Sequence, residues 1–218
     1  METMTAENSN ETNRLLLRAA DGDQESWGDL LTRHEDRLQR MVAFRLDQRL
    51  QGRIDPLDVV QEAFLEASEH RAEYFQNPSI TFLLWMRGIV GNKLRELHRF
   101  HLGTKMRDAG REVSLYRGTM PDASSAALAA QLLGHATRPS QAAIRAEVKI
   151  RLQEALNVMD PIDREVIALR HFEQLTPAET AHVLGIKEKA AGMRYLRALK
   201  RLKDILTSLP GGLKELRP

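Results

Sequence analysis

The stretch that decides the fold is TPAETAHVLGIKEKAAGMRYLRALKRLK, residues 176–203. Thr176, followed by a proline and then by Glu179, predicts a helix start. It supplies a hydroxyl cap, a proline at the first helical position and an acid in the first turn. Gly185 predicts the end of this helix, because glycine readily adopts the left-handed conformation that closes helices. A second helix is expected to begin near Lys187, so the stretch predicts a helix-turn-helix.

The second helix is predicted to have an apolar face and a basic face. Residues spaced three and four apart share the face that packs on the first helix: Ala191, Tyr195, Ala198 and Leu202. Basic residues dominate the other face: Lys187, Lys189, Arg194, Arg197, Lys200, Arg201 and Lys203. The whole chain has a formal net charge of only +2, so positive charge is concentrated here. A solvated basic face on a core helix is the alternative, but the preceding turn favours DNA binding.

The composition is that of an ordinary globular protein. The chain has 218 residues, 42% of them hydrophobic and 28% charged, which is enough for one or two small domains. It contains no cysteine, which excludes disulfides and thiolate zinc sites and fits a reducing cytoplasm. The N-terminus, METMTAENSNETN, does not have the form of a signal peptide. Apolar runs such as ITFLLWM are too short to span a bilayer, so we expect a soluble protein without membrane insertion. The expectation of a cytoplasmic location rests on the function.

Helical periodicity without strand alternation predicts an all-α chain of two small helical domains joined by a flexible linker. A long helix up to Val158, a turn at Asp160 and a helix from Ile162 to Phe172 are expected before the helix-turn-helix. The predicted parts are a disordered N-terminal tail (1–12), a first domain (13–102), a linker (103–140), a second domain with the helix-turn-helix (141–209) and a C-terminal tail (210–218).

Carboxylates line one face of a predicted helix in the first domain. They recur at spacings of three and four: Asp58, Glu62, Glu66, Glu69 and Glu73. Like charges at this spacing repel by about a few tenths of a kcal/mol per pair. Such a stripe is either a solvated face or a surface that meets a basic partner.

An aromatic loop and a basic helix follow the acidic helix. The loop is YFQNPS, residues 74–79, and the next helix is expected from about Ile80 to Phe100. This helix carries groups suited to phosphates and bases: Arg87, Asn92, Lys93, Arg95, Glu96, His98 and Arg99. Aromatic rings in the loop are suited to stack on an unstacked base, whereas Phe82 and Trp85 are expected in the core.

The order of these features resembles bacterial RNA polymerase sigma factors of the extracytoplasmic-function (ECF) group of the sigma-70 family. The resemblance rests on DPLDVVQEAFLEA (55–67), the aromatic loop, FLLWMRGIVGNKLRELHR (82–99) and the C-terminal run from Met159 to Lys203. The separate blocks match in the right order and at the right separation, over most of the chain.

The resemblance implies a function and a set of partners. The first domain would be sigma region 2 and the second would be region 4, and together they would direct core RNA polymerase to promoter DNA. The acidic helix would dock on the clamp of the polymerase's largest subunit, and the flap region and an anti-sigma factor are further implied partners. The implied polymerase-binding residues are Asp55, Asp58, Gln61, Glu62 and Glu66.

The resemblance also implies two DNA-binding sites. In the first domain, a flipped base of the minus-ten element would be held by Phe75, Asn77, Asn92, Lys93, Glu96 and Arg99. In the second domain, the helix-turn-helix would bind the minus-thirty-five element in the major groove through Lys187, Lys189, Ala190, Met193, Arg194 and Arg197.

The chain departs from the family pattern at two places. Relatives usually carry a threonine-valine-lysine-serine type of run at the start of the recognition helix, where this chain has AAGM, residues 190–193. Short side chains there predict that the minus-thirty-five element is read partly through phosphates and backbone geometry. The loop YFQNPSITF is slightly longer than the common pattern, which leaves open which base it captures.

Two other functions remain as alternatives. A helix-turn-helix regulator would bind duplex DNA without forming a holoenzyme, and the acidic stripe argues against it. A DNA-processing enzyme would need a nucleophile or a metal cluster in the first domain. His98 and His101 are three residues apart, but on a helix rich in arginine they favour a surface or nucleic-acid role. We therefore expect no enzymatic activity, no cofactor and no metal site.

Overall fold

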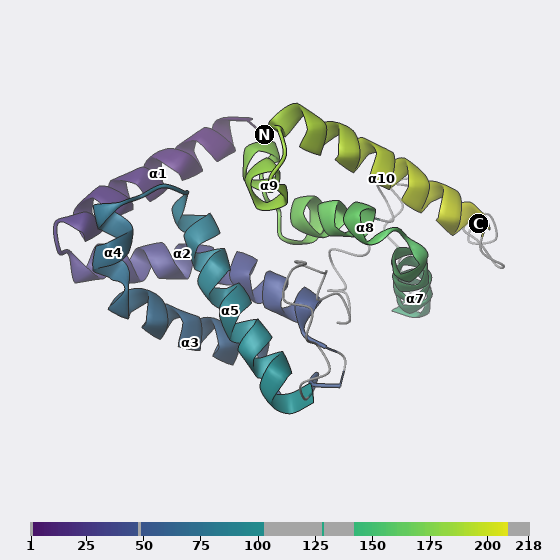
Figure 1. Cartoon of the computed structure of the whole chain (residues 1–218), viewed down its shortest axis with the longest axis horizontal. Helices are drawn as coiled ribbons and strands as arrows, with labels where there is room; N and C mark the ends of the chain where they lie inside the picture. The colour runs from purple at the N-terminus through teal and green to yellow at the C-terminus, as the bar shows by residue number, and fades with distance from the viewer. Residues whose placement is uncertain (1, 48, 103–127, 129–141, 209–218) are drawn as a thin grey trace. The chain divides into compact units, whose positions relative to one another are not determined.

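The chain folds into two helical units. The computed structural model describes residues 2–47, 49–102, 128 and 142–208, and within these ranges it contains helices and no β-strand (Figure 1). The first unit comprises residues 1–42 and 52–105, and the second comprises residues 43–51 and 106–218. The all-α prediction is confirmed. The predicted linker, apart from Leu128, and the predicted C-terminal tail lie outside the described residues.

The helices of the first unit are α1 (Glu2–Ala20), α2 (Gln24–Arg45, whose last residues belong to the second unit), α3 (Pro56–Glu69), α4 (Arg71–Gln76) and α5 (Phe82–Leu102). Those of the second unit are α7 (Ala142–Val158), α8 (Pro161–Ile167), the π-helix η2 (Ala168–Phe172), α9 (Pro177–Leu184) and α10 (Glu188–Ser208).

Helix α1 corrects the predicted N-terminal tail, because residues 2–12 are helical rather than disordered. No glycine or proline interrupts residues 2–20, so the helix extends without a break from its packed C-terminal half toward the N-terminus. In that half Leu15 and Ala19 are buried. Arg33 on α2 donates a hydrogen bond from Nε to the Thr12 hydroxyl at 3.1 Å, which ties α1 to α2.

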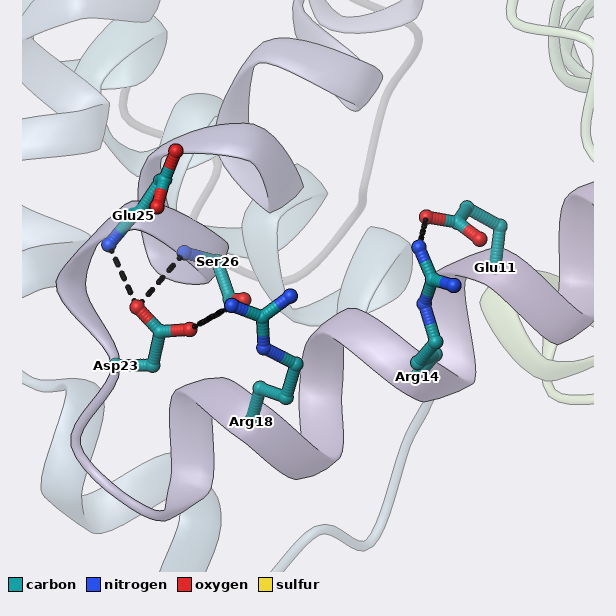
Figure 2. A network of polar contacts seen from close by, with 6 residues as sticks. All are labelled: Glu11, Arg14, Arg18, Asp23, Glu25 and Ser26. Atoms are coloured by element: carbon teal, nitrogen blue, oxygen red, sulfur yellow. Dashed lines mark hydrogen bonds and ion pairs between the residues drawn. The ribbon is translucent and has the colours of Figure 1, made fainter.

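The turn between α1 and α2 is held by Asp23, as Figure 2 shows. Its carboxylate accepts hydrogen bonds from the Ser26 hydroxyl at 2.8 Å and from the Glu25 backbone N–H at 3.0 Å. The bond from the Glu25 N–H satisfies a backbone donor that the start of α2 leaves open. Arg18 pairs with the same carboxylate at 2.6 Å, and one turn earlier Arg14 pairs with Glu11 at 2.8 Å. The Ser26 hydrogen bond is the main reason that the pKa of Asp23 is lowered.

An aromatic cluster forms much of the core of the first unit. Its members are Trp27, Tyr74, Phe75, Phe82 and Trp85. The rings of Tyr74 and Trp85 lie 4.7 Å apart between centroids, and Trp27 donates its indole N–H to the Ser68 hydroxyl at 2.9 Å. Phe82 is buried and Trp85 half-buried, as expected for core residues. Tyr74 and Phe75, however, lie on the short helix α4 rather than in a loop.

The core of the second unit is built from α7, α8, η2 and α10, together with Leu128 and Phe44. The rings of Phe44 and Phe172 stack with centroids 4.3 Å apart. The predicted helix from Ile162 to Phe172 is confirmed, and its second half, Ala168–Phe172, widens into the π-helix. There the Glu173 N–H donates to the Ala168 carbonyl at 2.9 Å, a bond that spans five residues.

A buried charge cluster lies in this second unit. Arg45 donates to Glu173 from Nε at 2.6 Å and to Glu165 from Nη2 at 2.6 Å. The Arg45 and Glu173 side chains are 7% and 2% exposed, so their charges are compensated by each other rather than by water. Burial opposes the charged form, but the two carboxylates outweigh it and raise the pKa of Arg45. Residues 43–51 thus correct the domain prediction, which placed them within the first domain.

Candidate nucleic-acid interface

The helix-turn-helix has the caps that its sequence predicts. The Thr176 hydroxyl accepts a hydrogen bond from the Glu179 N–H at 3.1 Å, and the Glu179 carboxylate accepts one from the Thr176 N–H at 2.8 Å. This reciprocal pair is a capping box. Gly185 ends α9 in the left-handed conformation, with φ 61° and ψ 33°. The Ile186 N–H then donates to the Ala181 carbonyl at 3.0 Å and fixes the turn before α10.

Helix α10 packs its apolar face and exposes most of its predicted DNA-binding residues. Ala191, Ala198 and Leu202 are buried. Tyr195 is half-buried, with the Arg170 guanidinium 5.4 Å from its ring centroid. The predicted minus-thirty-five residues lie near the start of α10, where Arg194 is half-buried and the others are exposed: Lys187, Lys189, Ala190, Met193 and Arg197.

One basic residue of α10 has a structural partner. Arg201 forms an ion pair with Asp163 on α8, whose side chain is buried. This contact holds α10 against α8 and engages the Arg201 charge within the protein. The other basic residues of this face keep their charge at the surface, and Lys187, Lys189, Arg197, Lys200 and Lys203 are exposed.

Helix α3 presents the acidic face that the sequence predicts, but over a shorter length. Asp55 caps the helix by accepting a hydrogen bond from the Leu57 N–H at 2.8 Å. The helix ends at Glu69, because His70 has φ −94° and ψ 9°, outside the helical range. Glu73 consequently lies on α4, and the single-helix stripe is corrected to Asp58, Glu62, Glu66 and Glu69.

The other predicted polymerase-binding residues lie on or near the same face. Asp58, Gln61 and Glu62 are exposed, and Gln61 donates to Glu35 on α2 at 2.8 Å. Leu65 lies among them with 70% of its surface exposed. Sequence reasoning missed Leu65 as a surface residue, because its neighbours Phe64 and Ala67 are buried and apolar residues in a helix are usually assigned to the core.

Helix α5 carries the basic residues predicted for the minus-ten element. Asn92, Glu96 and Arg99 are exposed, and Asn92 accepts a hydrogen bond from Arg95. Lys93 is half-buried, and its ammonium lies 2.8 Å from a Glu66 carboxylate oxygen on α3. The hydrogen bond to Glu66 is the largest cause of the raised pKa of Lys93.

The residues predicted on the aromatic loop are placed differently. Phe75 is half-buried on α4, with its ring centroid 5.3 Å from that of Tyr74 and 6.1 Å from that of Trp27. Asn77 is exposed and ends α4. Phe75 is therefore packed in the core cluster on one side, so only part of its ring faces solvent.

A shallow cavity separates the acidic face of α3 from the end of α5. Its volume is about 240 Å³, and it is lined by Val59, Glu62, Lys93, Glu96, Leu97 and Phe100. Phe100 is 83% exposed at its rim. Sequence reasoning used Phe100 only as the expected end of the helix. Its position beside Arg99, an aromatic ring next to a cation, was the signal available.

The described part of the chain contains neither a cluster of metal ligands nor a membrane-spanning helix. In this part, no group of three or more acidic, histidine or cysteine side chains is arranged to hold a metal ion. His98 is buried and His101 is exposed. None of the described helices is both long and apolar enough to cross a membrane.

An exposed, basic second helix behind a well-formed turn defines the class of protein as a helix-turn-helix DNA-binding protein. Comparison with protein families matches residues 149–202 to "Sigma-70, region 4". The RNA polymerase sigma factor NccH of Alcaligenes xylosoxydans xylosoxydans is 31% identical over 89% of this chain and 94% of its own length. The sigma factor CnrH of Cupriavidus metallidurans is 31% identical over 91% of this chain and 96% of its own length.

A further relative and a solved structure are also sigma factors. The ECF RNA polymerase sigma factor SigD of Mycobacterium tuberculosis is 27% identical over 87% of this chain and 81% of its own length. The solved structure of CnrH in complex with the cytosolic domain of CnrY has a TM-score of 0.53 and 26% identity, and covers 90% of this chain and 97% of that chain. The chain belongs to the RNA polymerase sigma factors, in their ECF group. It is a transcription initiation factor that gives core RNA polymerase its promoter specificity.

Proposed function

We propose that the three exposed surfaces divide the work of initiation among them. Helix α3 docks on the polymerase, α5 with the end of α4 holds the melted minus-ten element, and the N-terminal half of α10 binds the minus-thirty-five element. The observation that carries this proposal is the separation of charge: an exposed acidic face on α3 in one unit and an exposed basic face on α10 in the other. A protein that only bound DNA would not need the acidic face.

The docking surface consists of Asp55, Asp58, Gln61, Glu62 and Glu66. Repulsion among its carboxylates is relieved when a basic surface approaches, and complementary charge speeds association and selects the partner. We propose that this partner is the clamp of the largest polymerase subunit. Leu65, 70% exposed among these polar residues, supplies an apolar contact of the kind found at the centre of interfaces.

The minus-ten surface consists of Asn77, Asn92, Lys93, Glu96 and Arg99, with the accessible edge of Phe75. Arginine and lysine contact phosphates, whereas the amides and the carboxylate offer hydrogen bonds to the edge of an unstacked base. Phe100 adds an exposed ring in the same region, suited to stacking. These features support single-strand capture by the first unit.

The minus-thirty-five surface consists of Lys187, Lys189, Ala190, Met193, Arg194 and Arg197. Its long side chains are cationic and suit phosphates and guanines, while Ala190 and Met193 suit thymine methyl groups. The second unit would also meet the flap region of the polymerase. In this proposal the polymerase forms the bonds of the RNA, so the protein needs neither catalytic activity nor a cofactor of its own. It acts in the cytoplasm.

An inhibitory partner is a further part of the proposal. The solved CnrH structure holds the cytosolic domain of CnrY, and another similar fold is that of the sigma factor RpoE in complex with the anti-sigma factor NepR from Bartonella quintana. We propose that an anti-sigma factor covers the docking surface of this protein when transcription is not required.

Run-off transcription tests the proposal. Purified core RNA polymerase is given fragmented genomic DNA of the source organism, with and without the protein. Specific start sites are expected only when the protein is present, and their upstream sequences define the promoter. A protein that fails to bind core yet retards duplex DNA by itself would be a helix-turn-helix regulator instead.

A paired charge reversal tests the docking surface. Asp58→Lys with Glu62→Lys should weaken core binding by roughly a hundredfold, because like charges would then face each other. The control is Glu25→Lys with Asp29→Lys, which makes the same charge change at the same spacing on exposed positions of α2. Titration of labelled protein with core measures both. If both double variants weaken core binding equally, or if the Asp58→Lys, Glu62→Lys variant transcribes normally, α3 is not part of the docking surface.

A further inference from the structure

Lys93 belongs to the helix proposed to hold DNA, yet its contacts are with the helix proposed to hold the polymerase. Its ammonium lies 2.8 Å from the Glu66 carboxylate, and the two side chains are 27% and 30% exposed. Glu62 on α3 and Glu96 on α5 line the same cavity as Lys93. The cation is thus surrounded by carboxylates from both helices.

These neighbouring carboxylates lower the attraction of Lys93 for a phosphate. The ammonium stays charged, since Glu66 first, and then Glu96 and Glu62, raise its pKa. A phosphate approaching Lys93 must displace Glu66 and is repelled by Glu62 and Glu96. At the same time the ion pair is accessible to water, so it contributes little to folding stability and can be exchanged for another partner.

We propose that Glu66 is a positioning residue that masks Lys93 from DNA until the polymerase binds. This inference rests on the proposed docking of α3. When a basic surface of the polymerase takes up the carboxylates of Glu62 and Glu66, Lys93 is released to a phosphate of the melted strand. Polymerase binding and single-strand binding then favour each other, and each raises the affinity for the other by the same factor.

The test measures binding of the full chain, without polymerase, to a fluorescein-labelled single-stranded oligonucleotide of mixed sequence. Glu66→Gln should tighten binding by up to about fivefold, the equivalent of one accessible ion pair. It should also steepen the dependence of log affinity on log salt by roughly 0.7, as expected for one more phosphate contact on a single strand. Fluorescence anisotropy at several salt concentrations gives both values.

Two variants separate the ion pair from a change in net charge. Glu69→Gln removes the same charge from the same helix at an exposed position, and it should change binding much less than Glu66→Gln. In the Lys93→Gln background, Glu66→Gln should have no effect, because the cation that it would release is absent. Equal gains from Glu66→Gln and Glu69→Gln, or a gain that persists without Lys93, would overturn the inference.

A last comparison tests the release step. Glu66→Gln also removes a docking residue, so core polymerase is used at a concentration that titration shows to saturate each protein separately. Under this condition the wild-type protein and Glu66→Gln should bind a minus-ten single strand equally, and a remaining difference would overturn release by the polymerase. Run-off transcription by the wild-type protein is measured on the same preparation. If it fails, the proposed function falls, whereas a failed variant series beside normal transcription removes only the masking of Lys93.

Discussion

His34 is an unusual residue in the first unit because it is buried and its ring has no hydrogen-bond partner among the described residues. It is 8% exposed, and neither ring nitrogen forms a hydrogen bond with any described residue. Its ring centroid lies 5.5 Å from that of Phe82 in the aromatic cluster. Burial first, and then the charges of Arg37 and Arg33, lower its pKa to about 4. The folded protein therefore holds His34 neutral at pH 7.

This placement predicts a loss of stability in mild acid. The unfolded chain binds a proton at His34 near pH 6.5, but the folded chain does so only near pH 4, so the loss develops between these values as the pH falls. Between pH 7 and pH 5 it should reach about 2 kcal/mol. Denaturant titrations at both pH values measure it in the wild type and in His34→Leu. If the two proteins lose the same stability, His34 is not the responsible group.

Two glycines of the helix-turn-helix should respond oppositely to the same substitution. Gly185 has φ 61°, which strains any residue with a side chain, so Gly185→Ala should lose about 1 kcal/mol. Gly192 lies inside α10, and a Cβ there meets nothing within 4 Å. Gly192→Ala should therefore gain about 1 kcal/mol through helix propensity. Thermal unfolding compares them, and two changes of the same sign would contradict the assignment of these backbone positions.

The start of α10 leads to a prediction about promoter reading. Ala190 and Met193 offer no hydrogen bond to a base, so specificity is spread over phosphate contacts and DNA shape. With the promoter sequence in hand, no single base change in the minus-thirty-five element should cost more than about 3 kcal/mol. Holoenzyme binding to substituted duplexes measures these losses. Larger losses at several positions would show a denser set of base contacts than α10 presents.

At the level of elements, the sequence was sufficient to predict features that depend only on residues close together in the chain. The caps at Thr176 and Gly185 were predictable, because each acts within a few residues. The break at His70 and the π-helix at Ala168–Phe172 were not, because no glycine or proline marks them. Side chains next to both features pack against residues far away in the sequence, Phe75 against Trp27 and Phe172 against Phe44.

At the scale of the whole chain, contacts between residues far apart in sequence explain what periodicity did not reveal. Arg45 and Glu173 are 128 residues apart, and Arg45 had the appearance of an ordinary charged residue near the end of an amphipathic helix. Likewise, Lys93 and Glu66 were assigned to separate sites, and only the packing of α3 on α5 brings them together. The sequence predicted the kinds of surface, whereas the structure was needed to find the contacts between them.

Arg45→Ala should destabilise the second unit selectively. It removes the buried cation that pairs with Glu165 and Glu173, and breaking a buried pair by removing one partner costs about 3–5 kcal/mol. Both tryptophans, Trp27 and Trp85, lie in the first unit, so fluorescence follows that unit while circular dichroism follows all helices. We expect the two unfolding transitions to separate.

The control for this prediction is Arg49→Ala. Arg49 pairs with Asp47 at 2.9 Å, but its side chain is 59% exposed, and the buried Asp47 carboxylate keeps its hydrogen bond from the residue 49 backbone N–H, so the loss of Arg49 should cost much less than that of Arg45. If fluorescence and circular dichroism report the same unfolding transition in Arg45→Ala, and its stability equals that of Arg49→Ala, the buried cluster does not stabilise the second unit.

The membership of residues 43–51 in the second unit sets an order of events on the ribosome. Phe44 and Arg45 leave the exit tunnel early, but Glu165, Phe172 and Glu173 are made more than a hundred residues later. At bacterial or eukaryotic synthesis rates this delay is on the order of ten seconds. Helices α3 and α5 can pack during that time, while the second unit waits for its last residues. Nascent chains that stop before Glu165 would therefore present Phe44 without the Phe172 ring, and Arg45 without Glu165 and Glu173, to the chaperones of the cell.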